Sequence, residues 1–420
     1  MNLRDNRDRA LKAGPRQRPA QVVPLPPDRP PSTPAGTAIC DGVVTGLSAT
    51  LFSVLPRRDQ RLKAEQYLRG LRHAKGRKSI RNIAGYIGGA TAEQGLHHFI
   101  SDSTWDWQPM RAALAAHLEQ AAAPQAWVVR SLPIPKAGEH SVGVDRLFAP
   151  QLGHTFRGQQ AFGVWFASEE LSTPVNWRLL LPDQWLTDHE RRERARIPEG
   201  LARESREECA TAVAIETAQY GDLARRPVLL DLRGGAIRPT LARLAAARMP
   251  VIGRIDPSCR LTVADRALPG FGAGPLPALQ ILESTKGLRR PVRWLDAARR
   301  GTSRTSLASG VRVSLLDPRT GRQRSMLLLG EWRDPQRPPV GVWLTDLLNA
   351  PVGSLLQTAK LTRRVDRDVA EVGEQVGLRD FVGRSFRGWH RHITLVSAAH
   401  AATVLSAQGV ALDLRRDQAA

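Results

Sequence analysis

Between Leu51 and about Leu118 the apolar residues recur with the period of an α-helix. Ser79 is a suitable N-cap for one of these helices, and the Gly88-Gly89 pair is a suitable end for it. We therefore predict a helical region over residues 51–120, with helices at residues 59–72, 80–87, 91–99 and 110–118.

The middle of the chain has the pattern of strands and then of strands alternating with helices. Short apolar runs predict strands at residues 127–129, 161–167 and 175–181, with links that suit an antiparallel meander. A helix over residues 203–219, a strand from Pro227 to Asp231, a helix starting near Pro239 and a strand at residues 251–255 follow. This order of elements is the layout of the RNase H fold, so we predict an α/β protein whose core begins with residues 125–255.

Residues 256–350 interrupt this layout. Gly and Pro are frequent, and residues 311–315 alternate before a turn at residues 317–321, after which residues 326–329 return as a partner strand. We predict an inserted β-rich subdomain here. The core then resumes over residues 351–408 with C-terminal helices, one of which carries an apolar stripe of Val365, Val369, Val372 and Val376.

The two ends of the chain lack such patterns. Residues 1–40 are rich in proline and arginine and contain few apolar side chains, so they cannot bury enough surface to offset their ordering entropy. We predict a disordered tail at residues 1–40 and a second, short tail at residues 409–420.

Composition adds a strong charge. The chain carries 61 Lys and Arg against 40 Asp and Glu, which gives a net charge of +21. A surplus of this size indicates a polyanionic partner, and no amphipathic lipid-binding stretch stands out, so nucleic acid is favoured over a membrane. A high-GC genome that favours arginine codons is the alternative, but it does not explain why the charges cluster.

The basic residues gather in two clusters, and Arg384 and Arg387 lie near each other further along the chain. The N-terminal basic cluster, residues 57–81, holds ten Lys or Arg and two acids, and the insertion basic cluster, residues 286–304, holds seven and one. Short helices with cationic faces suit docking on the phosphates of double-stranded DNA; a solvated surface without a partner is the alternative. The candidate DNA-binding residues are Arg57, Arg58, Arg77, Lys78, Arg81, Arg289, Arg290, Arg299, Arg300, Arg384 and Arg387.

The apolar runs and the cysteines bear on where in the cell the protein resides. No run of 18 apolar residues is present, and the start of the chain has no hydrophobic stretch of signal-peptide length. The three cysteines, Cys40, Cys209 and Cys259, are widely spaced and form neither a disulfide framework nor a metal-binding pattern. We therefore expect a cytoplasmic, nucleoid-associated protein.

Asp231 is the first candidate for chemistry. It ends a buried strand, at the position where open α/β sheets place their ligands, although an Asp that merely closes a turn is the alternative. Asp366 lies beside the valine stripe, where it could point along the same edge of the sheet. His390 and His392 are two residues apart and do not share a helical face, so we expect packing or phosphate contact rather than metal binding.

The chain resembles a known family of enzymes. From Phe52 to His400 it is similar to bacterial insertion-sequence transposases of the DDE superfamily, which carry a β-rich insertion in an RNase H-like core. The resemblance rests on several segments in the right order: residues 67–71 (YLRGL), 105–106 (WD), 138–144 (GEHSVGV), 177–182 (WRLLLP), 329–332 (LGEW) and 383–392 (GRSFRGWHRH).

The resemblance implies a mechanism and a site. These enzymes hold two divalent metal ions, usually Mg²⁺, with three carboxylates, and cleave and transfer DNA strands. Asp231 matches the second acid, and Asp366 stands at the position of the third, which is usually Glu. Both are therefore candidate catalytic and metal-binding residues.

The first acid is missing. Where the family has a pair of aspartates and a threonine, this chain has Arg130, Ser131 and Leu132. Gly373 and Arg363 stand where the family has a lysine and an aromatic residue, and we predict that Gly373 lies on nearly the same helical face as Asp366, two turns further on. The nearby acids Glu139 and Asp145 fall in a segment that aligns outside the site. We expect Arg130 to pair with Asp231 or Asp366 and to leave no metal ion or one weakly held ion.

Three hypotheses remain open from the sequence. The first is a transposase-derived protein that binds DNA, such as its inverted-repeat ends, without cutting it; it could be a regulator, a competitor for element ends or a decayed copy. The second is a transposase with weak residual nicking or strand-transfer activity. The third is an interaction protein without specific DNA recognition. A homodimer is a further candidate assembly.

Overall fold

The computed structural model describes residues 34–149, 154–221, 223–299, 302–316 and 321–419. Residues 1–33, which make up most of the predicted N-terminal tail, lie outside the described residues, as do Arg300 and residues 317–320 of the predicted turn.

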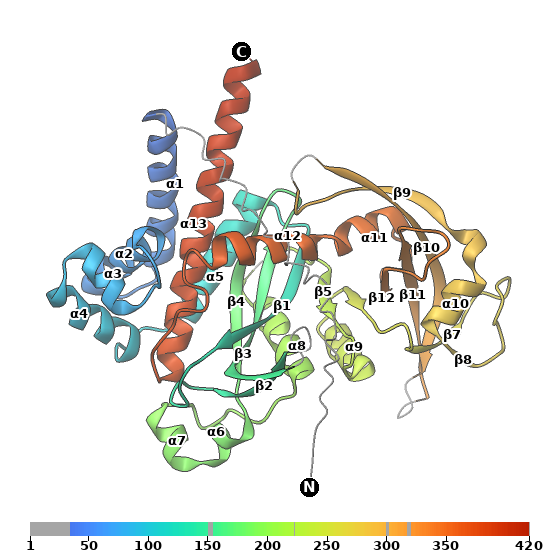
Figure 1. The fold of residues 1–420 in the computed structure, drawn as a ribbon, viewed down its shortest axis with the longest axis horizontal. Coiled ribbons are helices and arrows are strands. Elements are labelled where there is room, and N and C mark those ends of the chain that lie inside the picture. The colour runs from blue at the N-terminus through green and yellow to red at the C-terminus, as the bar shows by residue number, and fades with distance from the viewer. Residues whose placement is uncertain (1–33, 150–153, 222, 300–301, 317–320, 420) are drawn as a thin grey trace, which may run out of the picture.

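A single mixed sheet runs through the molecule (Figure 1). Its main path follows the strand order β2-β3-β1-β5-β6-β12-β11-β10-β7-β8, while β4 pairs with β3 and β9 pairs with β10. The strands are β1 (Ala126–Pro135), β2 (Asp145–Ala149), β3 (His154–Ala167), β4 (Ser172–Leu180), β5 (Val228–Asp231), β6 (Val251–Arg254), β7 (Arg260–Val263), β8 (Pro275–Pro277), β9 (Arg290–Leu295), β10 (Ser303–Leu316), β11 (Gln323–Trp332) and β12 (Gly341–Thr345).

The first part of this sheet has the predicted RNase H-like arrangement. β1, β3 and β4 pair antiparallel in chain order, and β5 and β6 then add to β1 in parallel. The five strands predicted from the apolar runs are all present. β1 continues to Pro135, and the pattern gave no sign of β2, because only five residues form it.

The insertion adds its strands to the same sheet. β12 pairs antiparallel with β6, the last parallel strand of the core, and β11 and β10 follow. The predicted hairpin between residues 311–315 and 326–329 is confirmed as part of the longer β10–β11 pair, in which Val313 lies opposite Met326. The insertion is therefore held to the core by backbone hydrogen bonds along β6.

Helices lie at one end of the molecule and on both faces of the sheet (Figure 1). α2, α3 and α4 form the end farthest from the insertion, and α1 lies against α13. The helices are α1 (Pro34–Phe52), α2 (Arg58–His73), α3 (Ile80–Ile87), α4 (Ala90–Ser101), α5 (Gln108–Ala122), α6 (Asp183–Thr187), α7 (His189–Arg194), α8 (Arg206–Thr217), α9 (Ile237–Ala246), α10 (Ala278–Ser284), α11 (Val352–Ala359), α12 (Leu361–Asp368) and α13 (Phe386–Ala419), with a 3₁₀ turn at Lys286–Leu288 and a π-helical turn at Val369–Gly373.

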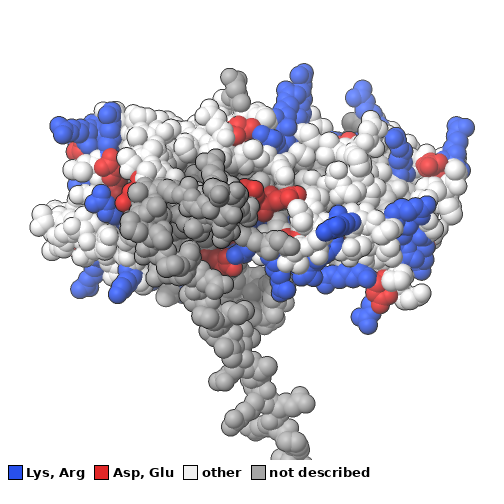
Figure 2. All heavy atoms as spheres, turned by 90° about the horizontal axis from the view of Figure 1, so that it is seen from above, with Lys and Arg blue, Asp and Glu red and all other residues white. Residues whose placement is uncertain are grey.

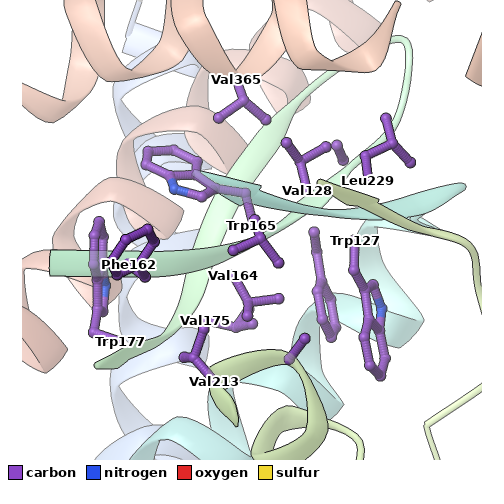
Figure 3. Packing of buried hydrophobic residues seen from close by; sticks show 14 of the residues in the cluster. Trp127, Val128, Phe162, Val164, Trp165, Val175, Trp177, Val213, Leu229 and Val365 are labelled. Carbon is purple, nitrogen blue, oxygen red and sulfur yellow. The ribbon is translucent and has the colours of Figure 1, made fainter. Parts of the chain in front are cut away.

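Alternating side chains of the core strands pack against helices on opposite faces (Figure 3). Val128 and Leu229 point toward α12 and its buried Val365, while Trp127 points to the other face, on which α8 lies with Val213. α8 is fixed at its start by a capping box between Ser205 and Glu208. This alternation decides which side chains at the strand ends face α12.

The ends of the chain differ from the prediction. α1 begins at Pro34, inside the predicted tail of residues 1–40, and it buries Leu47 and Leu51 further along. α13 runs to Ala419, so it includes most of the predicted tail of residues 409–420. The N-terminal tail was predicted from sparse apolar residues, and residues that extend a well-packed helix need few apolar side chains of their own.

Candidate functional site

Three neighbouring parallel strands change from buried to exposed at a charged residue. β1, β5 and β6 are buried up to Val129, Leu230 and Gly253 and then expose the next residue. These next residues are Arg130, Asp231 and Arg254, which we call the strand-end row. Carboxyl ends of parallel strands meet at one edge, which is where open α/β sheets bind ligands.

Register places the strand-end row side by side. Asp231 is paired with Arg254 across β5 and β6, and Val128 is paired with Leu229 across β1 and β5. Continuing the second register by two residues brings Arg130 level with Asp231. Because Val128 and Leu229 face α12, all three residues of the row face α12 too.

Asp366 approaches this row from α12. The Nε atom of Arg130 lies 2.9 Å from Oδ1 of Asp366, and both side chains are about half exposed, at 48% and 54%. The prediction that Arg130 pairs with Asp231 or Asp366 is confirmed for Asp366. An exposed pair like this contributes only about 0–1 kcal/mol to stability. Its consequence is chemical, because a guanidinium occupies one side of the carboxylate.

Asp231 is held by another arginine, Arg233. Its Oδ1 accepts hydrogen bonds from Nε of Arg233 at 2.9 Å and from the Arg233 backbone N–H at 3.1 Å, while Nη2 donates to Oδ2 at 2.5 Å. Burial by itself would raise the pKa of Asp231, but the hydrogen bonds and charge of Arg233 outweigh burial and lower the pKa. Asp231 is therefore an ionised carboxylate with both oxygens engaged.

Arg254 completes the row, and our sequence analysis missed it. Within the described part of the chain, no group forms a hydrogen bond or ion pair with its guanidinium. Burial and the charge of Arg233 lower the pKa of Arg254, against smaller opposing effects of Asp231, Glu331 and Asp366. The sequence shows a charged residue within the apolar run of residues 251–255, but the position of Arg254 beside Asp231 follows only from the pairing of β5 with β6.

The arrangement does not fit a pair of divalent metal ions. Three arginines, Arg130, Arg233 and Arg254, accompany two aspartates, so the formal charge of the group is about +1. Among the described residues, no three His, Cys, Asp or Glu side chains gather so that they could hold a metal ion. A metal site needs unpaired carboxylates to offset the charge of the ions, and here arginines already pair with both.

Glu139 and Asp145 lie away from Arg130. Asp145 on β2 and Pro135 on β1 are both level with Gly158 of β3, so Asp145 is displaced from Arg130 by five residues, roughly 16 Å, along the strands and by two strand spacings, roughly 10 Å, across them. Glu139 forms an ion pair with Arg157, at 2.7 Å from Nη2. Ser131 accepts a hydrogen bond from Gln160 at 2.7 Å.

The π-helical turn after α12 changes the face that the sequence predicted for Gly373. The extra residue of the turn buries Gly373, where a Cβ atom would come within 3.0 Å of Leu378. Glu374 is exposed instead and takes the side that Asp366 occupies two turns earlier. It pairs with Arg379, whose Nε donates to the carbonyl of Pro133 at 3.0 Å. The predicted alignment of Gly373 with Asp366 is therefore wrong.

Arg363 anchors α12 to the insertion. Its Nε and Nη2 donate to the two oxygens of Asp296 at 3.0 Å each, and Arg304 donates to the same carboxylate at 2.7 Å. The Asp296 side chain is fully buried. Next to this group, Lys360 pairs with the buried Glu331. These contacts fix the helix that carries Asp366.

His390 and His392 are packing residues, as the sequence analysis favoured over metal ligands. His390 lies 3.0 Å from Nη2 of the buried Arg111, and Nδ1 of His392 lies 2.9 Å from the Tyr67 hydroxyl. Burial lowers the pKa of His392 to about 4. Both histidines are therefore neutral and join α13 to α2 and α5.

One residue of the N-terminal basic cluster is out of reach of a ligand. Lys78 is only 6% exposed, its Nζ donates to the Ala74 carbonyl, and its backbone N–H donates to Asp380 at 2.7 Å. Its role in DNA binding stays a prediction that this burial does not favour, because the turn that carries Lys78 packs on Gly377. The other members stay exposed: Arg57 (paired with Asp59), Arg58, Arg77 and Arg81.

Basic side chains also cover the insertion. Figure 2 shows Lys and Arg along the half of the molecule that the insertion forms, with few acidic residues between them. Arg290 and Arg299 are exposed, whereas Arg289 lies over the ring of Trp332 at 5.2 Å. Arg384 and Arg387, at the start of α13, are exposed as well.

None of the helices in the described part of the chain combines the length and apolar character that crossing a bilayer requires.

Comparison with known protein families gives a match. The family of DDE superfamily endonucleases matches residues 50–309, which is more than half of the chain and spans the N-terminal helices, the first part of the core and much of the insertion. No curated protein matches the chain.

Proposed function

The chain belongs to the DDE superfamily of endonucleases, and from that premise we propose that it is a transposase-derived protein that binds double-stranded DNA without cutting it. One observation carries the proposal. The guanidinium of Arg130 forms an ion pair with Asp366, and the resemblance to the family implies that these residues stand at the positions of the first and third catalytic acids.

The absence of cutting follows from the charges. Endonucleases of this superfamily generally use divalent metal ions, which need a set of free carboxylates. Here Arg130 pairs with Asp366 and Arg233 pairs with Asp231. An incoming cation would have to displace two guanidiniums and would then be repelled by them, and guanidinium groups do not lose their protons in proteins.

Binding to DNA follows from the surface. The superfamily acts on DNA, and the exposed arginines at both ends of this molecule, Arg58, Arg77 and Arg81 at one and Arg290 and Arg299 at the other, are cations that would release counterions from phosphates. The ends of the parent element, its inverted repeats, are the DNA that we propose it reads. We further propose that it resides at the nucleoid and that it pairs with a second copy.

The test compares binding with cutting. The purified chain is incubated with duplex DNA from the flanks of its own gene, with Mg²⁺ and separately with Mn²⁺. We expect a shift in gel mobility and intact strands on a denaturing gel. A metal-dependent cut by the unmodified protein, lost in Asp231→Ala, would establish the residual transposase instead. Failure to bind any duplex at low salt would establish the interaction protein without DNA recognition.

A further inference from the structure

Among the described residues, none forms a hydrogen bond or ion pair with the guanidinium of Arg254, which lies at the edge where open α/β sheets bind ligands. Arg254 ends β6 as an exposed residue, directly level with Asp231. Both oxygens of the Asp231 carboxylate already accept hydrogen bonds from Arg233. Five N–H donors are thus available at this edge for an anion from outside the chain.

The other arginines near Arg254 add positive charge, which further favours the binding of an anion. Arg130 lies on the other side of Asp231, and two strand spacings put the Cα atoms of Arg130 and Arg254 about 10 Å apart. Both side chains face α12, so they border the same space. With Arg233 between them the group has a net charge of about +1, and like charges at this distance repel unless an anion joins them.

We infer that the strand-end row is a phosphodiester-binding site, in which Arg254 and Arg130 hold a backbone phosphate directly at the position where the superfamily holds metal ions. The planar guanidinium fork matches the oxygens of a phosphate and gives charge-assisted hydrogen bonds. Asp231 and Asp366 keep the forks in place, Asp231 through Arg233 and Asp366 through Arg130. The site binds the nucleic-acid backbone and has no means of cutting it.

This inference rests on the proposed DNA binding and adds a location for one contact. The basic clusters attract DNA through exposed side chains at the two ends of the molecule, whereas the strand-end row lies between them on the core sheet (Figure 1). A duplex that touched only the basic clusters would leave Arg254 open to solvent.

The experiment measures the reactivity of Arg254 itself. The full-length chain is treated with the arginine reagent phenylglyoxal, alone and with saturating duplex DNA, and modified arginines are located by mass spectrometry. We expect DNA to slow the modification of Arg254 several-fold. Arg225 is the internal reference, because it is an exposed arginine close to the opposite end of β5 and should react equally with and without DNA.

A variant pair gives the second readout. Arg254→Gln removes the charge, and Arg225→Gln is its matched control. In a plot of log affinity against log salt, loss of one phosphate contact lowers the slope by about 0.9, so we expect that change for Arg254→Gln only. Unchanged melting temperatures in both variants show that folding is not the cause.

The outcomes separate this inference from the proposed function. Salt-dependent DNA binding with an Arg254 that stays fully reactive, and with an unchanged slope in Arg254→Gln, overturns the inference and leaves the DNA-binding function intact. Protection of Arg254 by inorganic phosphate but not by DNA overturns the assignment to nucleic acid. A protein that binds no duplex at all overturns both.

Discussion

At the scale of single residues, Arg130 decides what the site can do. A carboxylate in its place would bring three acids together, with Asp231 on β5 and Asp366 on α12, whereas the guanidinium of Arg130 forms an ion pair with Asp366. Arg233 does the same to Asp231 from two residues away. Because Arg130 and Arg233 pair with the two aspartates, we expect the site to favour an anion over a metal cation. The strands beneath these arginines stay buried.

Restoring the acid tests this view. Arg130→Asp removes a cation, adds a carboxylate and frees Asp366, so we expect the affinity for Mn²⁺ to rise measurably in a titration followed by electron paramagnetic resonance. Arg130→Asn is the control, since it frees Asp366 without adding a ligand, and its gain should be smaller. Equal Mn²⁺ affinity in the unmodified chain and in Arg130→Asp would show that the row is not at the metal position. We expect no transposition from either variant, because Asp231 remains bound to Arg233.

At the scale of elements, the position of α12 depends on buried charges. Asp296 is fully buried and accepts from Arg363 of α12 and from Arg304 of β10. Burial would raise the pKa of Asp296, yet Arg363 first and Arg304 after it keep the pKa below its usual value. The carboxylate is therefore charged, and its removal leaves two guanidiniums facing each other.

Asp296→Asn should accordingly loosen α12. We expect a loss of about 1–3 kcal/mol in the free energy of unfolding, less than for a fully buried pair because both arginines keep about a third of their surface exposed. Hydrogen exchange should quicken in α12 more than in α8. Asp334→Asn, which breaks the surface pair with Arg337, is the control and should change stability by less than about 0.5 kcal/mol. Equal losses in the two variants would contradict the anchoring role.

α13 carries two buried histidines, His392 and His400, whose protonation affects stability. Burial lowers the pKa values of His392 and His400 to about 4, from an unfolded value of about 6.5. Between these values the unfolded chain binds more protons than the folded chain, so stability is complete above pH of about 6.5 and falls as the pH drops toward 4. Each histidine contributes a slope of about 1.4 kcal/mol per pH unit in this window.

His392→Gln tests that slope. Urea unfolding at several pH values should show a dependence on pH that is smaller by about 1.4 kcal/mol per unit, whatever the absolute stability of the variant. His189→Gln is the control, because the His189 side chain is 89% exposed and its replacement should leave the slope unchanged. A slope in His392→Gln equal to that of the unmodified chain would mean that His392 is protonated in the folded protein.

The elements themselves were largely predictable, and the site was only partly so. Apolar runs predict β1, β5 and β6 because burial on both faces of a parallel sheet demands them. Arg254 can be recognised as a residue of the site only when the pairing of β5 with β6 is known, and no local sequence pattern predicts this pairing. The sequence pattern did not predict the π-helical turn either, and in the structure Gly373 is buried and Glu374 is exposed after this turn. Side-chain partners depend on such long-range register, so Arg233 and Arg254 had to come from the structure.

At the scale of the whole molecule, the continuous sheet explains how distant charges can serve one ligand. β6 joins the core to β12 of the insertion, so the insertion basic cluster and the strand-end row belong to one sheet. The N-terminal helices add their exposed arginines at the far end (Figure 1). A duplex that lay along this length would meet cations at both ends and in the middle, which favours many phosphate contacts.

The salt dependence of DNA binding measures those contacts. If six to ten phosphates are neutralised, affinity should fall by roughly 10³ to 10⁵ between about 50 and 200 mM salt. The double variant Arg77→Gln, Arg81→Gln removes two exposed charges of the N-terminal basic cluster and leaves the buried Lys78 in place. Its slope of log affinity against log salt should be lower by up to about 1.8, two contacts at about 0.9 each.

The control for this variant removes the same charge from α7. Arg194 is exposed and Arg191 is partly exposed, and they already pair with Glu190 and Asp188, so their replacement by Gln should leave the slope close to that of the unmodified chain. Fluorescence anisotropy of one labelled duplex over a series of salt concentrations gives all three slopes. A double variant of Arg77 and Arg81 that keeps the full slope would take the N-terminal helices out of the interface and leave the insertion and the strand-end row to carry the DNA.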